Sequence, residues 1–131
     1  MKLGVFNPIL AGMPFEDAMK YLADSGVQAV EIGCGGFPGK AHCDPAVLLN
    51  DEAELEKFKA VLEKNHLEIS ALSTHGNAVH PNKEIAKQFH EDFENAVLLA
   101  EKLGVKKIIT DLAFHEFEII EGVKETLEAL Q

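Results

Sequence analysis

The sequence has few cysteines, few basic residues and no long apolar run. Its 131 residues include two cysteines, Cys34 and Cys43, which lack the Cys-x-x-Cys spacing of metal and redox motifs. No apolar run approaches the ~20 residues that a membrane span requires. Met1–Phe6 enters a strand-like pattern directly and lacks the features of a secretory signal peptide. These absences predict a reduced, cytoplasmic protein with no membrane partner.

The scarcity of basic residues argues against binding to a nucleic acid. Lysine and arginine together number 12 and acidic residues 22, so the formal net charge is −10 at pH 7. Phosphate backbones are bound by clustered Lys and Arg side chains, and the sequence shows no basic stripe. A small phosphorylated molecule needs only one or two local donors, so this class of ligand stays open. No linker or low-complexity stretch divides the chain, which predicts one domain over residues 1–131.

A unit of amphipathic helix, break and apolar run recurs along the chain. The predicted helices cover Phe15–Ser25, Leu55–Lys64 and Ile85–Leu103, and the apolar runs that follow them cover Val27–Ile32, Leu67–Leu72 and Val105–Thr110. A strand-like segment, Lys2–Phe6, comes first, and a last helix is expected over Ile119–Leu130. Because parallel strands need a crossover helix between them, this alternation predicts an α/β fold with four to five parallel strands and flanking helices.

Residues at the expected helix ends support these boundaries. Gly26 and Gly104 follow the first and third helices, where a left-handed residue commonly ends a helix, and Asn65 is expected to adopt this conformation after the second. Asn50 or Asp51 is expected to cap the second helix, because either side chain can accept from the free N–H groups of the first turn. The turns at this end of the sheet are therefore expected to be short.

The segments that follow the predicted strands are longer and are polar or rich in glycine. They cover residues 7–12, 33–43 and 73–82, and they contain His42, His75 and His80. We expect His42 to face solvent. In parallel α/β folds, ligands bind beyond the carboxyl ends of the strands. The contrast between the two ends predicts a functional site at the carboxyl end.

His75 and Glu31 are the first candidates for chemistry at this end. His75 follows the third strand, where an imidazole can bind a divalent metal or donate to a substrate oxygen. The alternative is a loop histidine bonded to the backbone. Glu31 is the penultimate residue of an otherwise apolar strand, and a carboxylate pointing into a barrel mouth needs a partner or a metal. The alternative is a side chain that lies at a helix end in solvent.

Cys34 and His80 are further candidates in the same segments. Cys34 lies in the run Gly33–Gly36, which lacks the GxGxxG spacing of a dinucleotide fingerprint. This run can still bring backbone amides near a phosphate, and Cys34 can act as a nucleophile if His75 serves as its base. His80 precedes Pro81, a setting that favours a role in structuring the loop over one in binding.

His115 and Glu116 form a second group of imidazole and carboxylate. They follow the apolar run 108–114, which is long for one strand. Both residues can ligate a metal. The alternative is the start of the last helix, where Glu116 and Glu118 would lie at the positive end of the helix dipole.

Three segments of the chain carry a resemblance to one family. The runs Val30–Gly35, Ile69–Asn77 and His80–Asn82 resemble the sugar phosphate isomerase/epimerase group of xylose isomerase-like TIM barrels, and the likeness extends from Met1 to about Thr110. Members are (β/α)8 barrels that typically bind a divalent metal and isomerise or epimerise sugars by removing a proton beside a carbonyl. The resemblance implies a sugar or sugar phosphate as ligand and Mn, Mg, Zn or Co as metal. The implied site residues are Glu31 and His75 as catalytic, Cys34, Asn77 and His80 as substrate-binding, and His75, His115 and Glu116 as metal-binding.

A full barrel of this kind has ~250 residues, about twice the length of this chain. The resemblance therefore covers an N-terminal half, and residues 111–131 resemble the last strand and helix, as if the middle of a barrel had been removed. Two half-barrels would pair across their open sheet edges, so a homodimer or higher oligomer is expected. A folded fragment without turnover is the alternative. Endonuclease IV-like DNA repair is a third interpretation, which the net charge of −10 disfavours.

Overall fold

The computed structural model describes residues 1–111, which form an α/β fold. Its strands are β1 (Gly4–Phe6), β2 (Ala29–Gly36), β3 (Glu68–His75) and β4 (Ile108–Ile109). Its α-helices are α1 (Phe15–Asp24), α2 (Pro45–Asn50), α3 (Glu52–Lys64) and α4 (Lys83–Leu103), and a short 3-10 helix, η1 (Asn7–Leu10), follows β1. Strands and helices therefore alternate as the sequence predicted.

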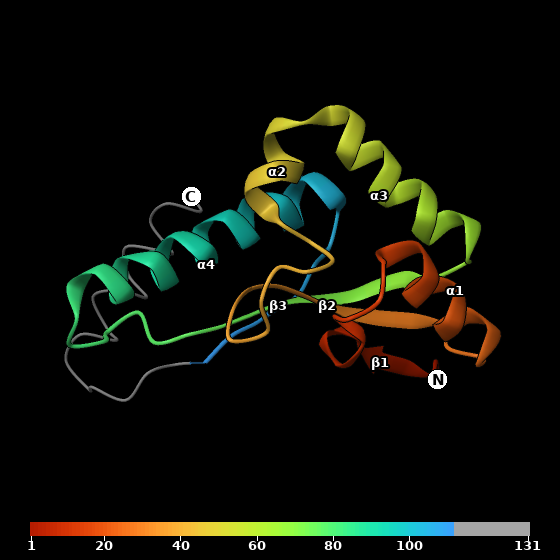
Figure 1. Cartoon of the computed structure of the whole chain (residues 1–131), viewed down its shortest axis with the longest axis horizontal. Helices are drawn as coiled ribbons and strands as arrows, with labels where there is room; N and C mark the ends of the chain where they lie inside the picture. The colour runs from red at the N-terminus through yellow and green to blue at the C-terminus, as the bar shows by residue number, and fades with distance from the viewer. Residues whose placement is uncertain (112–131) are drawn as a thin grey trace.

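The four strands are all parallel and lie in the order β1-β2-β3-β4. Figure 1 shows the four α-helices on one side of this sheet. A doubly wound fold places helices on both faces of its sheet, whereas a (β/α) barrel keeps them all on the outside. The described residues thus form an open sheet consistent with part of a TIM barrel, which confirms the predicted fold class.

The register of the sheet separates the face that packs on the helices from the opposite face. Residues in register share a face, and successive residues alternate between faces. The residues of the first face belong to the hydrophobic core or pack against it: Val5, Val30, Ile69, Ile32, Leu72 and Ile108. The second face, which would line the interior of a closed barrel, carries Phe6, Glu31, Ala71, Gly33, Ser73 and Ile109.

One apolar stripe on each long helix completes the core. The helix residues that are buried there lie at helical spacing: Ala18, Met19 and Leu22 of α1, Leu55, Phe58 and Leu62 of α3, and Ala96, Leu99 and Ala100 of α4. Fully burying a Leu, Met or Phe side chain contributes about 1.5–3 kcal/mol, so these stripes hold the helices on the sheet.

The helix ends follow the predicted chemistry with one exception. Gly26 and Gly104 have φ of 83° and 69°, the left-handed conformation that the sequence predicted for them. The prediction for Asn65 is wrong by one residue, because Asn65 has φ of −97° and His66 has φ of 53°. The side chain of Asn65 instead donates to the carbonyl oxygen of Val61. The amino-end turns are short, as predicted.

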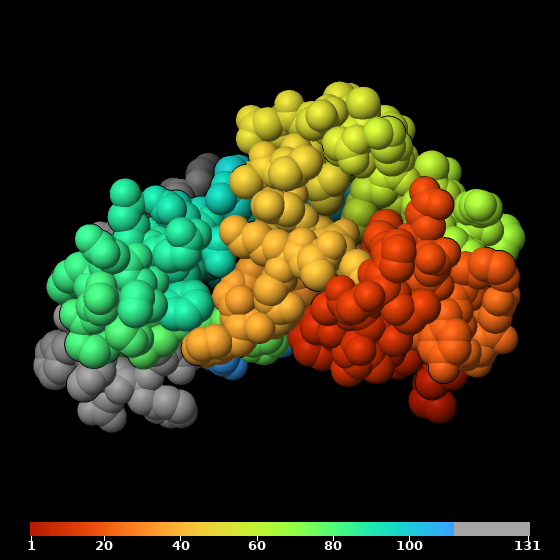
Figure 2. Space-filling view, viewed as in Figure 1, coloured from red at the N-terminus to blue at the C-terminus, as the bar shows by residue number. Residues whose placement is uncertain are grey.

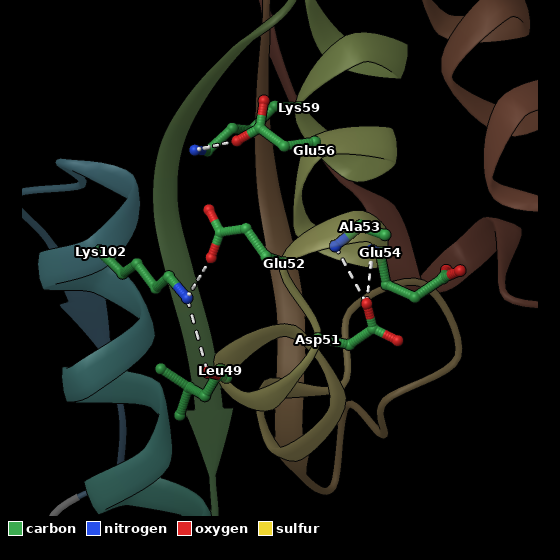
Figure 3. Close-up of polar contacts among 8 residues, drawn as sticks. All are labelled: Leu49, Asp51, Glu52, Ala53, Glu54, Glu56, Lys59 and Lys102. Atoms are coloured by element: carbon green, nitrogen blue, oxygen red, sulfur yellow. Dashed lines mark hydrogen bonds and ion pairs between the residues drawn. The ribbon is translucent and has the colours of Figure 1, made fainter.

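The junction of α2 and α3 is fixed by a cap and by a lysine from α4 (Figure 3). Asp51 accepts from the backbone N–H groups of Ala53 and Glu54, so Asp51 is the cap of α3. Lys102 of α4 lies 3.0 Å from a carboxylate oxygen of Glu52. Helix α2 itself was not predicted, although Asp44 followed by Pro45 is a common start for a helix.

The strands β2 and β3 run further than the sequence predicted. They continue to Gly36 and His75, so the runs Gly33–Gly36 and Ser73–His75 are strand ends and not loops. The pairing of β2 with β3 shifts register twice along its length, between Val30 and Glu31 and between Gly33 and Gly35. Such irregularities re-aim side chains near the ends of strands.

Two findings bear on the remaining expectations. In residues 1–111, no helix is both long enough and apolar enough to span a membrane. The helix expected over Ile119–Leu130, and most of the segment 111–131 that resembles the last strand and helix of a barrel, lie outside the described residues. Those expectations stay predictions.

Candidate active site

Buried polar side chains gather at the carboxyl end of the sheet. Among the described residues, the buried polar and charged side chains are those of Asn7, Ser73, Thr74 and Asp92. Asn7 follows β1, Ser73 and Thr74 are near the end of β3, and Asp92 of α4 bonds to the end of β2. Buried polar groups cost free energy unless they are hydrogen-bonded, and within residues 1–111 every buried side-chain nitrogen and oxygen has a partner.

His75 ends β3 and pairs with a carboxylate beyond β4. Its Nδ1 lies 3.0 Å from Oδ1 of Asp111. A carboxylate only accepts, so Nδ1 carries the proton, and in the neutral tautomer Nε2 is left as an acceptor. The side chain of His75 is 25% exposed, which leaves it accessible. An imidazole oriented by a carboxylate in this way is suited to accepting and returning a proton.

Glu31 and Ser73 form a second polar pair on the sheet face that points away from the helices. Ser73 donates a hydrogen bond from Oγ to Oε1 of Glu31. Ser73 is buried and Glu31 is half-buried, so Glu31 has the partner that a carboxylate in this position needs. By the two-residue alternation of a strand, His75 projects from the same face as Ser73. The fold thus brings Glu31 and His75 to one face of the sheet.

Asn7 links β1 to β2 and to the segment after β2. Its Oδ1 accepts from the N–H of Gly33 at 3.0 Å, and its Nδ2 lies 2.8 Å from Nδ1 of His42. Nε2 of His42 lies 2.8 Å from the carbonyl oxygen of Met13, which makes Nε2 the donor and Nδ1 the acceptor. The expectation that His42 faces solvent is wrong, because both of its ring nitrogens are bonded within the protein.

Asp92 of α4 holds the segment after β2 in place. Its Oδ2 accepts from the N–H of Gly36 at 2.9 Å, and its Oδ1 lies 2.6 Å from Nζ of Lys40. Burial alone raises the pKa of Asp92, but the hydrogen bonds from Lys40 and Gly36 outweigh it and leave that pKa below its ordinary value. The same hydrogen bond raises the pKa of Lys40. Figure 2 shows this segment, in orange, between α4 and the amino-terminal residues.

Cys34 lies in the core and not at the open end of the site. Its side chain is fully buried, and Sγ lies 3.5 Å from the carbonyl oxygen of Ser73. Burial, and then the charge of Asp92, raise the pKa of the Cys34 thiol to about 12, which disfavours the thiolate that a nucleophile requires. We therefore assign Cys34 neither a nucleophilic role nor a substrate contact.

Asn77 and His80 structure the connection between β3 and α4. Oδ1 of Asn77 accepts from the N–H of Val79, and Nδ1 of His80 accepts from the N–H of Asn82, each at 3.0 Å. Asn82 in turn caps α4 by accepting from the N–H of Glu84 at 2.9 Å. Contact of Asn77 or His80 with a substrate stays a prediction.

The described residues do not supply a metal-binding set. Within residues 1–111, no three side chains of His, Cys, Asp or Glu lie together as ligands of one ion. His75 and Asp111 are a pair, and Glu31 is bonded to Ser73. The other predicted ligands, His115 and Glu116, lie outside the described residues. Their role in binding a metal stays a prediction.

A surface hollow elsewhere on the molecule contains none of these candidates. It lies between α1 and α3, in the helix layer. Its lining is largely charged and comprises Glu16, Asp17, Lys20, Lys57, Ala60, Val61, Lys64 and Asn65. The carboxyl end of the sheet therefore remains the better place for chemistry.

Sequence reasoning missed several residues of the site. A signal for Asp92 was present, because it lies three residues after Phe89 and four before Ala96 on the apolar stripe of its helix, where a carboxylate needs a partner. Asn7, directly after a strand, was a similar signal. Asp111 and Lys40 had no local signal, because their partners are distant in sequence.

Comparison with known proteins agrees with this fold. The family model for the Xylose isomerase-like TIM barrel matches residues 19–130. The protein of Bacillus subtilis (strain 168) named Uncharacterized protein YfiH is 32% identical over 109 residues, which are 83% of this chain and 34% of that protein. The chain thus spans about a third of the length of the curated relative it matches. Because the family model covers most of the sequence and the sheet has the expected order, this chain belongs to the Xylose isomerase-like TIM barrel family.

Proposed function

We propose that this chain carries the proton-transfer part of a sugar isomerase or epimerase, with His75 as its acid–base. The observation that carries the proposal is the bond between Nδ1 of His75 and Asp111 at the carboxyl end of the sheet. Asp111 fixes the tautomer and leaves Nε2 to take a proton from the carbon beside a sugar carbonyl. Return of that proton by His75 to the neighbouring carbon, with transfer of the hydroxyl proton to the carbonyl oxygen, completes an isomerisation. An epimerisation needs a second acid that protonates the opposite face of the same carbon.

Glu31 and Ser73 contribute polar groups on the same face of the sheet. The Glu31 carboxylate, oriented by the Ser73 hydroxyl, is placed to accept hydrogen bonds from sugar hydroxyls. A sugar or sugar phosphate suits this site better than DNA, because the chain has a net charge of −10 and no basic stripe. Membership of the family supports both the reaction class and the use of a divalent metal.

The test is exchange of the carbon-bound proton in D2O, followed by NMR. D-xylose, D-glucose and D-glucose 6-phosphate serve as candidate substrates. His75→Asn should lower the exchange rate by about 100-fold or more, because the base is lost. His66→Asn is the matched control, since His66 lies in a turn at the opposite end of the sheet and has a positive φ that Asn tolerates. Exchange that survives in His75→Asn would refute the role of His75, and no exchange in the parent chain would favour the fragment without turnover.

We further propose that a second copy of the chain completes the barrel. Within the described residues, β1 pairs only with β2 and β4 only with β3, so both edges of the sheet are free. Phe6 and Ile109, on the face opposite the helices, are 37% and 40% exposed at these edges. Two copies related by a two-fold axis would join β1 of each to β4 of the other, giving the eight parallel strands of a TIM barrel.

The solution mass, measured by size exclusion with light scattering, tests this second proposal. We expect a dimer, and we expect Ile109→Lys to weaken it because a charge would enter the joined face. Leu98→Lys, at an exposed apolar position on α4, is the control. A monomeric parent chain would contradict the completed barrel.

A further inference from the structure

Phe37, the residue after β2, keeps its ring in solvent although its backbone is firmly held. Its residue exposure is 73%. Its N–H donates to the carbonyl oxygen of His75 at 2.7 Å. Gly36 before it and Lys40 after it are both bonded to the Asp92 carboxylate. The Phe37 ring is therefore presented from a fixed backbone, which is bonded directly to the backbone of the proposed acid–base.

Two glycines permit this close arrangement. Gly36 has φ of +62°, and a Cβ there would lie 1.9 Å from the carbonyl oxygen of His75. A Cβ at Gly76, the residue after His75, would lie 2.2 Å from the ring of Phe89. The missing side chains let β2, β3 and α4 approach one another at this point.

Phe89 of α4 supports the exposed ring. The centroids of Phe37 and Phe89 are 5.2 Å apart and their planes are inclined by 57°, within the range of tilted aromatic pairs. Phe89 also lies against Gly76. The two rings thus form an aromatic shelf, defined here as Phe37 and Phe89, next to the end of β3.

We propose that the aromatic shelf binds the apolar C–H face of a sugar ring and so determines which sugars reach His75. The proposal rests on the proposed function. Ligand sites combine apolar and aromatic walls with a few polar groups that fix orientation. A sugar ring matches that combination, since its hydroxyl edge can bond to the polar pairs Glu31–Ser73 and His75–Asp111 while its C–H face lies on an aromatic ring. The negative face of an aromatic ring attracts such C–H groups.

The experiment uses the absence of tryptophan from the chain. In Phe37→Trp, the fluorescence of the single tryptophan reports on the shelf, and Tyr21→Trp on α1 is the matched control at a 56% exposed position. We expect D-xylose to change the emission of Phe37→Trp in a saturable way and to leave that of Tyr21→Trp unchanged. Xylitol, which has the hydroxyls without the ring, should have a smaller effect.

Affinity measured by calorimetry separates this proposal from the proposed function. Phe37→Ala should weaken D-xylose binding about three- to tenfold, and Phe37→Tyr should retain it. If Phe37→Ala binds D-xylose as tightly as the parent while His75→Asn abolishes proton exchange, the role of the aromatic shelf is refuted and the proposed function is supported. If Phe37→Ala binds D-xylose more weakly than the parent but the parent exchanges no proton, the role of the aromatic shelf is supported and the proposed function is refuted. A parent chain that binds neither D-xylose nor D-glucose would overturn both, and circular dichroism of each variant controls for folding.

Discussion

The two ends of the parallel sheet belong to the same four strands but differ in their polar contacts. At the carboxyl end, Asn7 and Asp92 are buried and bond to backbone N–H groups of β2. At the amino end, the strands begin after short turns, and the pair between Lys2 and Glu68 has side chains that are 56% and 52% exposed. Water can replace a contact at the amino end, whereas a buried group at the carboxyl end has only its protein partner.

The buried polar groups of the sheet are thus concentrated at its carboxyl end. An exposed ion pair contributes about 0–1 kcal/mol, while an unpaired buried group costs about 1–3 kcal/mol. A fold that needed only stability would fill both ends with apolar side chains. Polar groups held rigidly at one end are what a binding site requires.

The largest effect is expected from Asp92→Ala. This change leaves the N–H of Gly36 and the ammonium of Lys40 without their partner, and we expect the free energy of unfolding to fall by about 2–4 kcal/mol. Urea denaturation measures it. Glu94→Ala on the same helix is the control, because the Glu94 side chain is 60% exposed. Equal losses in the two variants would contradict the contrast between buried and exposed groups.

A smaller loss, about 1–3 kcal/mol, is expected from Asn7→Ala. The change removes the acceptor for Gly33 and the donor for His42 at a residue that is 2% exposed. Thermal unfolding followed by circular dichroism tests it against Asn50→Ala, whose amide is exposed and donates to a helix carbonyl. If the two variants unfold at the same temperature, the hydrogen bonds of Asn7 stabilise the fold less than its burial indicates.

The pH dependence of stability tests the ion pair between Asp92 and Lys40 at the carboxyl end. Since the folded-state pKa of Asp92 is lowered, its stabilisation is present above the unfolded pKa and is lost as pH falls through the folded value. The raised pKa of Lys40 gives stabilisation that is lost only as pH rises through its folded value. The stability difference between the parent and Asp92→Asn should therefore be constant between about pH 5 and 9 and shrink below about pH 4. A difference that persists unchanged in acid would rule out this ion pair as its source.

The smallest effect is expected at the amino end. Glu68→Gln breaks the exposed pair with Lys2 and should change the free energy of unfolding by less than about 0.5 kcal/mol. The same urea series used for Asp92→Ala measures it. A loss above about 1 kcal/mol would mean that the amino end is more tightly coupled than its exposure indicates.

Much of the fold was predictable because its signals are local. The helix stripes, the cap at Asp51 and the left-handed ends at Gly26 and Gly104 depend on residues a few positions apart. The residue with the left-handed conformation after α3 is His66 and not Asn65, although asparagine adopts that conformation more readily. The extensions of β2 and β3 were missed because strand ends depend on a partner across the sheet.

The sequence could suggest where a site would lie but not which contacts its residues make. The glycine-rich and histidine-containing segments led to the prediction of a site at the carboxyl end, and His75 and Glu31 were named from their positions. Their partners, Asp111 and Ser73, lie 36 and 42 residues away in sequence. Cys34 lies in the core, two residues after the buried Ile32, where the alternation of the strand places it on the face that packs on the helices.

By itself, the sequence determined the alternation of strands and helices, the acidic surface and the family, because periodicity, composition and motif are properties of neighbouring residues. Only the tertiary structure decided that Asn7 holds β2, that Asp92 holds the segment after it, and that Asp111 orients His75. Such bonds join groups that are far apart in the chain, and they form only when packing removes water and leaves each buried group one partner.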